Sequence, residues 1–154
     1  MKKDTTTIKN LDLPRYMGRW YEIARITHNF ERGLVGCTAD YALNDNGTVK
    51  VVNSGYKNSI TGRLHTAVGK AKQPDPAYPG CLKVSFFLWF YSDYLIFELE
   101  EKNYSYALIG SSSPDYLWIL SRTPELPDSD MKFLLKRLEE RGYNTDKLYF
   151  TPQR

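Results

Sequence analysis

The sequence predicts an all-β chain, either an antiparallel barrel or a sandwich, that ends in one helix. Turn-forming clusters recur at short intervals, as in "NDNG" at 44–47, "KNSITG" at 57–62 and "QPDPAYPG" at 73–80. The segments between them are rich in Val, Ile, Tyr, Phe and Thr, which favour strands. A helical period appears only near the C-terminus. The length of 154 residues suits a single domain.

Eight strands are expected before residue 123, each bounded by one of these turns. Their expected ranges are roughly 19–28, 37–44, 48–56, 62–72, 82–90, 94–101, 104–111 and 116–122. Regular antiparallel strands with short connections favour a continuous meander.

The segment "PDSDMKFLLKRLEERG" predicts a helix, because its apolar residues recur at helical spacing: Met131, Leu134, Leu135 and Leu138. Asp128 is placed to cap its start, Gly142 to end it, and 147–150 reads as a short last strand. The eighth strand is apolar on both faces. We therefore expect Leu117 and Ile119 to face outward under the helix.

Composition argues against several classes of protein. The 21 basic and 18 acidic residues give a net charge of +3 without a block of like charge, so a nucleic-acid partner is not predicted. The longest nearly apolar run, 84–91, is much shorter than the roughly 20 residues of a membrane-spanning helix. The first ten residues lack the apolar stretch of a signal peptide, but a leader can have been removed, so the location stays open.

Several short motifs, in the expected order, resemble the lipocalin family, in particular the branch of bacterial outer-membrane lipocalins and apolipoprotein D. The resemblance lies in "GRWYEIARI" (18–26), "NSGY" (53–56), "GKA" (69–71), "LKVSFF" (82–87) and "LWILSRTP" (117–124). It covers about residues 13–150, so we expect a tail at 1–12 and one domain at 13–154. The turn "EEKNYS" (100–105) departs from the Thr-Asp-Tyr common in the family.

The resemblance implies an eight-stranded up-and-down barrel, closed at one end and open at the other, with room for one small ligand. It implies storage or transport of a fatty acid, a lysophospholipid or a similar lipid at the bacterial cell envelope, as an outer membrane lipoprotein or in the periplasm. A monomer or a weak homodimer is expected, with a membrane surface as a further partner. In the family, Arg122 would pack across Trp20 at the barrel floor, with Gly18 before it.

Strict alternation from Trp20 predicts which side chains face the interior. In the sixth strand either Tyr94, Ile96 and Glu98 or Leu95, Phe97 and Leu99 face inward, and the wholly apolar second set is favoured. The expected ligand-binding residues are Glu22, Ala24, Cys37, Ala39, Tyr41, Val51, Asn53, Arg63, His65, Ala67, Val84, Phe86, Leu88, Leu95, Phe97, Ile109, Ser111, Tyr116, Trp118 and Leu120.

Three of these residues carry charge or can do so, and each has two readings. Glu22 either accepts hydrogen bonds from neighbours in the floor or meets a polar group of the ligand. Arg63 and His65 lie near the mouth, where they either bind a carboxylate or phosphate head group or form a solvated rim.

The chemistry-bearing motifs of enzymes are missing from the sequence. Cys37 and Cys81 fit no zinc or redox spacing, and no Gly-x-Ser-x-Gly motif occurs, so no cofactor, metal or catalytic residue is predicted. The barrel would place the two cysteines at opposite ends, which predicts two free thiols. Two alternatives stay open, a thiol-dependent lipid isomerase using Cys37 and a membrane or protein docking module using the aromatic loop 87–94.

Overall fold

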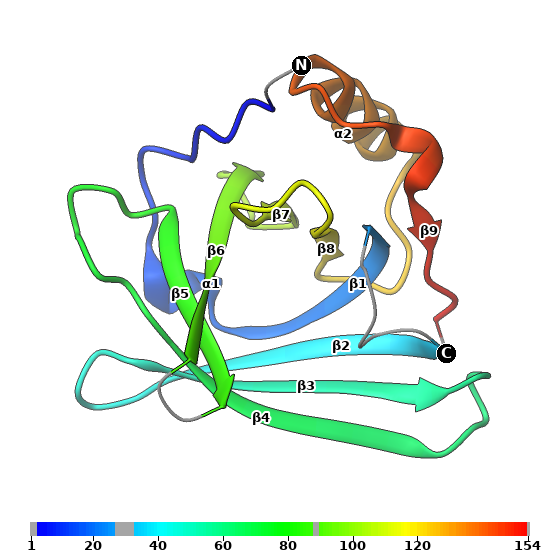
Figure 1. The fold of residues 1–154 in the computed structure, drawn as a ribbon, viewed down its shortest axis with the longest axis horizontal. Helices are drawn as coiled ribbons and strands as arrows, with labels where there is room; N and C mark the ends of the chain where they lie inside the picture. The colour runs from blue at the N-terminus through cyan, green and yellow to red at the C-terminus, as the bar shows by residue number, and fades with distance from the viewer. Residues whose placement is uncertain (1–2, 27–32, 88–89, 154) are drawn as a thin grey trace.

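The computed structural model describes residues 3–26, 33–87 and 90–153, and it has nine strands and one long helix (Figure 1). The helices are α1 (Leu13–Tyr16), α2 (Asp128–Glu140) and the 3-10 turn η1 (Thr145–Lys147). The strands are β1 (Gly18–Ile26), β2 (Leu34–Leu43), β3 (Val49–Lys57), β4 (Leu64–Lys72), β5 (Cys81–Phe87), β6 (Phe90–Leu99), β7 (Tyr106–Gly110), β8 (Leu117–Ser121) and β9 (Tyr149–Phe150).

The strands form a closed antiparallel up-and-down barrel, as the family resemblance implies. Consecutive strands from β2 to β8 pair with one another, and β1 closes the barrel by pairing with both β8 and β2. Figure 1 shows β2, β3 and β4 as one wall, facing β6, β7, β8 and β1 across the interior. The extra strand β9 pairs with β1.

The C-terminal segment bridges the gap that opens between β1 and β2. Only the first four residues of β1 pair with β2. Further along, Thr151 donates its N–H to the carbonyl of Ile23 on β1, and the N–H of Gly36 on β2 donates to the carbonyl of Pro152. The chain end therefore completes the barrel wall where β1 and β2 diverge.

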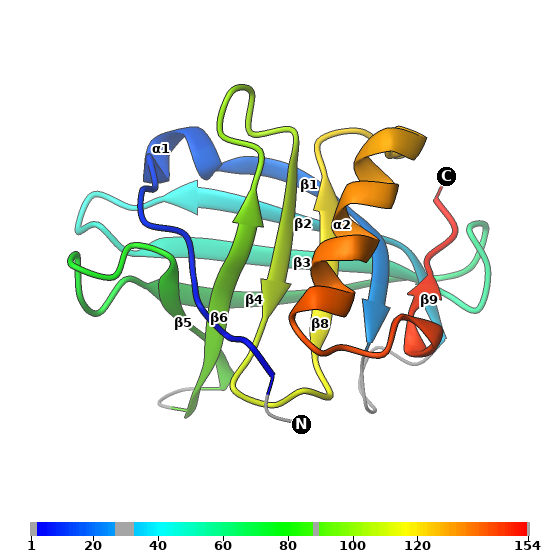
Figure 2. The ribbon, with the colours of Figure 1, turned by 90° about the horizontal axis from the view of Figure 1, so that it is seen from above.

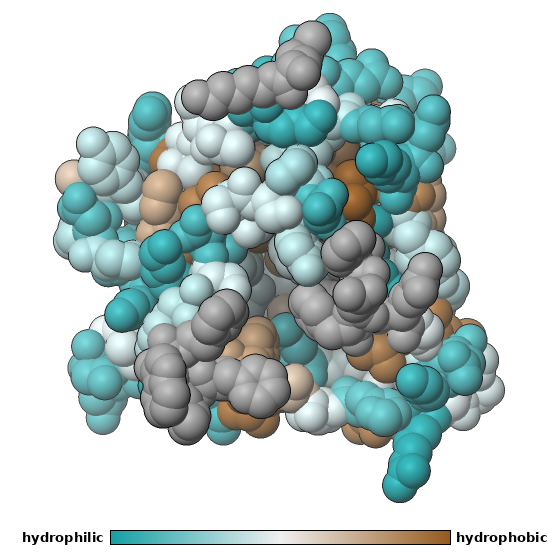
Figure 3. All heavy atoms as spheres, in the orientation of Figure 1, coloured by the Kyte–Doolittle hydropathy of each residue, from teal (hydrophilic) through white to brown (hydrophobic). Residues whose placement is uncertain are grey.

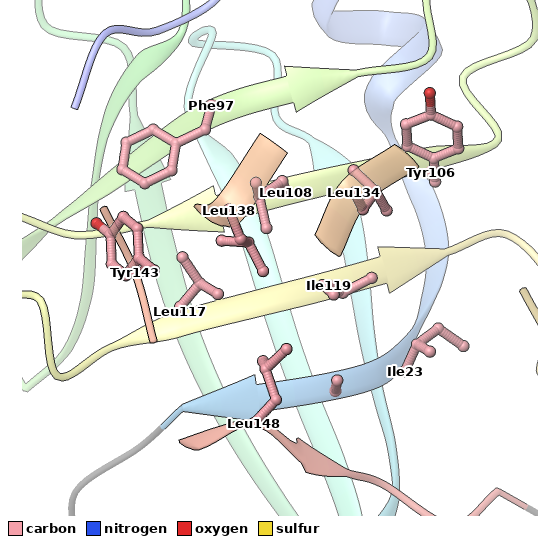
Figure 4. Packing of buried hydrophobic residues seen from close by; sticks show 11 residues of the cluster. Ile23, Phe97, Tyr106, Leu108, Leu117, Ile119, Leu134, Leu138, Tyr143 and Leu148 are labelled. Atoms are coloured by element: carbon pink, nitrogen blue, oxygen red, sulfur yellow. The ribbon is translucent and has the colours of Figure 1, made fainter. Parts of the chain in front are cut away.

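Helix α2 covers the outside of the barrel at β7, β8 and β1 (Figure 2). Leu134 and Leu138 of the helix are fully buried against Leu117 and Ile119 of β8, as Figure 4 shows. This packing confirms that the two β8 side chains face outward under the helix. Burial of this size contributes about 2 kcal/mol per leucine side chain.

The helix boundaries agree with the sequence at one end only. Gly142 follows the helix with φ +92°, a conformation that glycine adopts without strain, so the expected end is confirmed. At the start, Pro127 is the N-cap residue and makes no side-chain cap hydrogen bond, while Asp128 is already helical. The expected Asp128 cap is therefore wrong. Asp128 instead lies in the first turn, where its negative charge interacts favourably with the helix dipole.

A β-bulge in β1 changes which side chains enter the barrel. The pairing of β1 with β8 shifts between Glu22 and Ala24, so that Ile23 and Ala24 both pack in the outer core beneath α2. The expectation that Ala24 faces the interior is therefore wrong, because alternation fails at a bulge. Arg25 takes the inward position instead, opposite Trp118 of β8.

A second bulge, in β6, has the same effect. The pairing of β6 with β7 shifts between Ile96 and Glu98. Leu95 and Phe97 pack in the outer core with the helix, whereas Ile96 and Leu99 pack in the inner cluster. The prediction that Leu95 and Phe97 face the interior is therefore wrong. Leu99, the third residue of that predicted set, does point inward.

The first residues of the chain run along the outside of the barrel, beside β6 (Figure 2). Ile8 donates its N–H to the carbonyl of Ile96, and Asp4 donates its N–H to the carbonyl of Arg141 after α2. This segment covers part of the outer surface of β6. Among the described residues, none of the helices has the length and apolar character needed to cross a bilayer.

Candidate functional site

The closed end of the barrel is built around Trp20, which is fully buried. Its indole N–H donates to the carbonyl of Tyr16 in α1 at 2.9 Å, so the short helix and the first strand hold each other in place. The guanidinium of Arg122 lies 3.8 Å from the centroid of the indole ring. It also donates to the carbonyls of Arg15 and Arg19, and these bonds tie the end of β8 to the start of β1.

Gly18 lies where the chain turns from α1 into β1. Its φ is +99°, a left-handed conformation in which a side chain is strained. A Cβ at this position would stand 3.4 Å from Nη1 of Arg122. The glycine therefore allows both the tight turn and the close approach of the arginine.

Three tyrosine hydroxyls meet above this floor. The hydroxyl of Tyr94 lies 2.6 Å from that of Tyr16 and 2.9 Å from that of Tyr41. Burial raises the pKa of Tyr16 and of Tyr94 well above the ordinary value of 10.0. The deepest part of the interior is therefore a neutral, hydrogen-bonded aromatic cluster.

The middle of the interior is lined with apolar and small side chains. Val51 packs with Val49 and Ala71 in a cluster that Tyr41 and Val84 also contact. Ile109 and Leu120 pack with Trp20 in the larger inner cluster, which Trp118 contacts. A row of cross-strand partners continues the face of Trp20 onto the opposite wall, namely Ala39, Asn53 and Ala67. Partners across an antiparallel pair share a face, so these three also face inward.

Glu22 lies inside the barrel and is almost completely buried. One of its carboxylate oxygens accepts a hydrogen bond from Arg25 at 2.8 Å and another from the Thr151 hydroxyl at 2.7 Å. The side-chain amide of Gln153 donates to the carbonyls of Glu22 and Cys37. Glu22 is thus paired with the guanidinium of Arg25. The pair lies where the C-terminal segment bridges the gap between β1 and β2.

Both cysteines are free thiols, as the sequence predicts. The sulfur of Cys37 is buried beside the same gap between β1 and β2, 3.6 Å from Nη1 of Arg25. Cys81 is half-buried, with its sulfur 3.5 Å from the hydroxyl of Thr7. Groups of His, Cys, Asp and Glu that could hold a metal ion do not occur within residues 3–26, 33–87 and 90–153.

The mouth is most open along β4. This strand pairs with β5 only through Lys70, Ala71 and Lys72, so its first half has β3 on one edge alone among the described residues. Arg63, which precedes the strand, and His65 and Ala67 within it are exposed. The open inner face of β4 therefore gives a ligand access to the interior.

The remaining expected site residues lie on β5 and beside the ends of β7 and β8. The ring of Phe86 covers Gly69, leaving no room for a side chain there. Ser111 follows β7, and Tyr116 precedes β8, where its ring stacks on that of Trp118 at 6.2 Å. Leu88 and the tip of the aromatic loop 87–94 lie outside the described residues.

The sequence pattern did not predict that Arg25 faces the interior. It also made the set that contains Tyr94 and Ile96 the less favoured choice for the inward face of β6. Strict alternation places Arg25 outside, opposite in facing to Glu22. Yet an acid and a base three positions apart in a buried strand would each cost free energy alone, so a bulge that pairs them is favoured. That pattern in "EIAR" was the available signal.

The fold and the interior define a class of protein: a small-ligand-binding β-barrel with one closed end and one open end. The chain belongs to the lipocalin family, because the family model described as "Lipocalin-like domain" matches residues 11–153.

Similar proteins agree with this assignment. The chain is 39% identical to the outer membrane lipoprotein Blc of Vibrio cholerae, over 99% of this chain and 89% of that protein. It is 35% identical to apolipoprotein D of Mus musculus, over 94% of this chain and 78% of that protein. The structure of insecticyanin from the tobacco hornworm Manduca sexta superposes with a TM-score of 0.78 at 20% identity, covering 100% of this chain and 87% of that one.

Family membership implies that the barrel binds a small hydrophobic ligand. Lipocalins are generally binding proteins, which is consistent with a role other than catalysis. The relatives named outer membrane lipoproteins support a location in the cell envelope.

Proposed function

We propose that this lipocalin binds a single-chain lipid with an anionic head group, a fatty acid or a lysophospholipid. The acyl chain would occupy the apolar middle of the barrel, above the tyrosine cluster. The head group would lie at the mouth, within reach of Arg63 and His65.

The observation that carries this proposal is the exposed inner face of β4. Ala67 lies exposed on that face opposite Asn53 of β3, and its small side chain leaves volume there, whereas Ala71 packs against Val49 and Val51 deeper in the barrel. Arg63 and His65 continue the same face toward the solvent. A cation at the rim of an apolar cavity suits a ligand that has one charged end and one apolar end.

Displacement of a fluorescent fatty acid tests where the ligand lies. Ala67→Trp would fill the interior and is expected to weaken binding at least about tenfold, because an indole replaces the space for the acyl chain. Ala42→Trp is the matched control. It makes the same substitution on an exposed position of β2 whose partner, Lys50, faces outward. Equal loss in both variants would contradict binding inside the barrel.

A second comparison tests the head-group contact. Arg63→Ala is expected to weaken binding of a fatty acid about fivefold, the size of an exposed ion pair, and to leave binding of its methyl ester unchanged. If the acid and the ester lose affinity equally, Arg63 does not contact the head group.

A further inference from the structure

The outer face of the β3–β4 hairpin gathers positive charge that the linear sequence spreads out. Between Asp45 and Asp75 the chain has no acidic residue and five basic ones, Lys50, Lys57, Arg63, Lys70 and Lys72. Since Val49, Val51 and Ala71 pack inside the barrel, the even-numbered residues of both strands face outward. Three lysines, at positions 50, 70 and 72, therefore share the outer face.

The register of the strands brings these lysines together. Lys50 and Lys70 are direct cross-strand partners. The ammonium groups of Lys70 and Lys72 lie 5.8 and 4.3 Å from the centroid of one ring, that of Tyr91. The Tyr91 ring stabilises two of the lysines, but like charges placed opposite each other destabilise a sheet, so an anionic partner would stabilise the cluster further.

Basic residues on strands near this hairpin do have acidic partners. Lys83 on β5 pairs with Asp93, and Arg19 pairs with Asp40 on β2 at 2.9 Å. Lys50, Lys70 and Lys72 are exposed and make no ion pair with any described residue. The cluster is therefore a positive patch without an acidic partner among the described residues.

An exposed apolar strip continues from the lysines along the same face. Val68 is 59% exposed and Leu64 is 54% exposed, and their cross-strand partners are Val52 and Tyr56. The strip ends at a hollow of about 310 Å³, which Leu64 and Tyr56 border together with Thr38 of β2. Figure 3 shows hydrophobic side chains at the lower edge of the molecule, where β4 lies in the same orientation.

We propose that this outer face of β3 and β4 docks on the surface of an anionic phospholipid bilayer. Lysines beside exposed aliphatic side chains match the two parts of a bilayer interface, the anionic head groups and the acyl region beneath them. A second copy of the chain fits less well, because the lysines of two such faces would repel each other. The face lies outside the barrel, so docking does not use the ligand-binding interior.

Vesicle flotation tests the proposal with phosphatidylcholine vesicles that contain or lack phosphatidylglycerol. The protein is expected to bind only the anionic vesicles and to be released by high salt. Each lysine near such a surface contributes roughly a fivefold change in affinity, so the combined Lys50→Gln, Lys70→Gln, Lys72→Gln variant should bind roughly a hundredfold more weakly. Val68→Ser should weaken binding without changing the charge.

A matched control separates the patch from net charge. The combined Lys9→Gln, Lys132→Gln, Lys136→Gln variant removes the same charge from exposed positions elsewhere and should bind like the parent protein. Displacement of the fluorescent fatty acid, measured without vesicles, should be unchanged in every variant and so reports folding.

Three outcomes would overturn the docking surface. The first is that the parent protein does not bind the anionic vesicles. The second is that both triple variants weaken binding equally. The third is concentration-dependent self-association that Val68→Ser abolishes, which would assign the face to a second copy of the chain. None of these outcomes bears on whether the barrel holds a lipid.

Discussion

The two walls of the barrel differ in how they are covered. All five residues of β7 are buried, and β8 is buried on both faces because the barrel interior lies on one side and α2 on the other. In β4, by contrast, every residue except Gly69 and Ala71 is exposed. Most of the stability is therefore expected to come from the helix-covered wall, whereas β4 in the other wall contributes little burial.

The largest expected effect comes from a cavity beneath the helix. Leu138→Ala is expected to lower the free energy of unfolding by about 2–5 kcal/mol, because the side chain is fully buried between α2 and β8. Val68→Ala removes a similar aliphatic group from the exposed wall and should cost less than about 0.5 kcal/mol. Urea denaturation monitored by circular dichroism measures both. Similar losses would show that the two walls contribute equally.

A smaller effect separates two carboxylates beside the bulges, the buried Glu22 and the half-buried Glu98. Glu98 lies outside the barrel and accepts hydrogen bonds from Arg137 and Arg141, whereas Glu22 lies inside and pairs with Arg25. Glu22→Gln and Glu98→Gln are each expected to cost about 1–3 kcal/mol of stability, since each weakens a hydrogen bond to a charged group. Only the first removes the anionic partner of a cation inside the barrel.

Ligand binding should therefore distinguish the two variants. Glu22→Gln is expected to raise the affinity for a fatty acid about tenfold, because it removes a negative charge from the interior and leaves the positive charge of Arg25 to attract an anionic ligand. Glu98→Gln should leave the affinity unchanged. Isothermal titration calorimetry with the same fatty acid measures both. If Glu22→Gln binds like the parent protein, Glu22 serves only to hold the barrel wall together.

The comparison of the two walls also shows how far the sequence alone can lead. Alternation and turn spacing predict the eight strands and the helix over β8, because these depend on local patterns, and the family resemblance selects a barrel over a sandwich. They fail at Ala24, Leu95 and Phe97, because a bulge inserts one residue and reverses the facing of the residues beyond it. The pairing of Glu22 with Arg25 also depends on this insertion.

Cross-strand register is the other property that single strands do not specify. Lys50 and Lys70 are twenty positions apart, and the pairing of β3 with β4 makes them neighbours. In the same way, the hydroxyls of Tyr16, Tyr41 and Tyr94 come from α1, β2 and β6. Long-range pairing decides both clusters, so neither could be predicted from the spacing of residues along the chain.

The smallest expected effect concerns this tyrosine cluster, at the junction of the two walls. Because burial raises the pKa of Tyr16 and Tyr94 in the folded protein, both hydroxyls bind their protons more tightly there than in the unfolded chain. Their contribution to stability is complete below the unfolded pKa, which is close to 10, and is lost as the pH rises above it. The free energy of unfolding should therefore fall between pH 10 and 11 by about 1 kcal/mol per buried tyrosine.

Tyr94→Phe tests that assignment. At pH 7 the variant should be about 1 kcal/mol less stable than the parent, because the hydrogen bonds to Tyr16 and Tyr41 are lost. Above pH 10 this difference should shrink, because phenylalanine has no proton to lose. Tyr78→Phe is the matched control at a position that is 63% exposed, and its stability should track that of the parent at every pH. If the free energy of unfolding falls equally with pH in Tyr94→Phe and in the parent, the buried hydroxyl does not cause the loss of stability above pH 10. Packing of the rings alone would then hold the junction between the walls together.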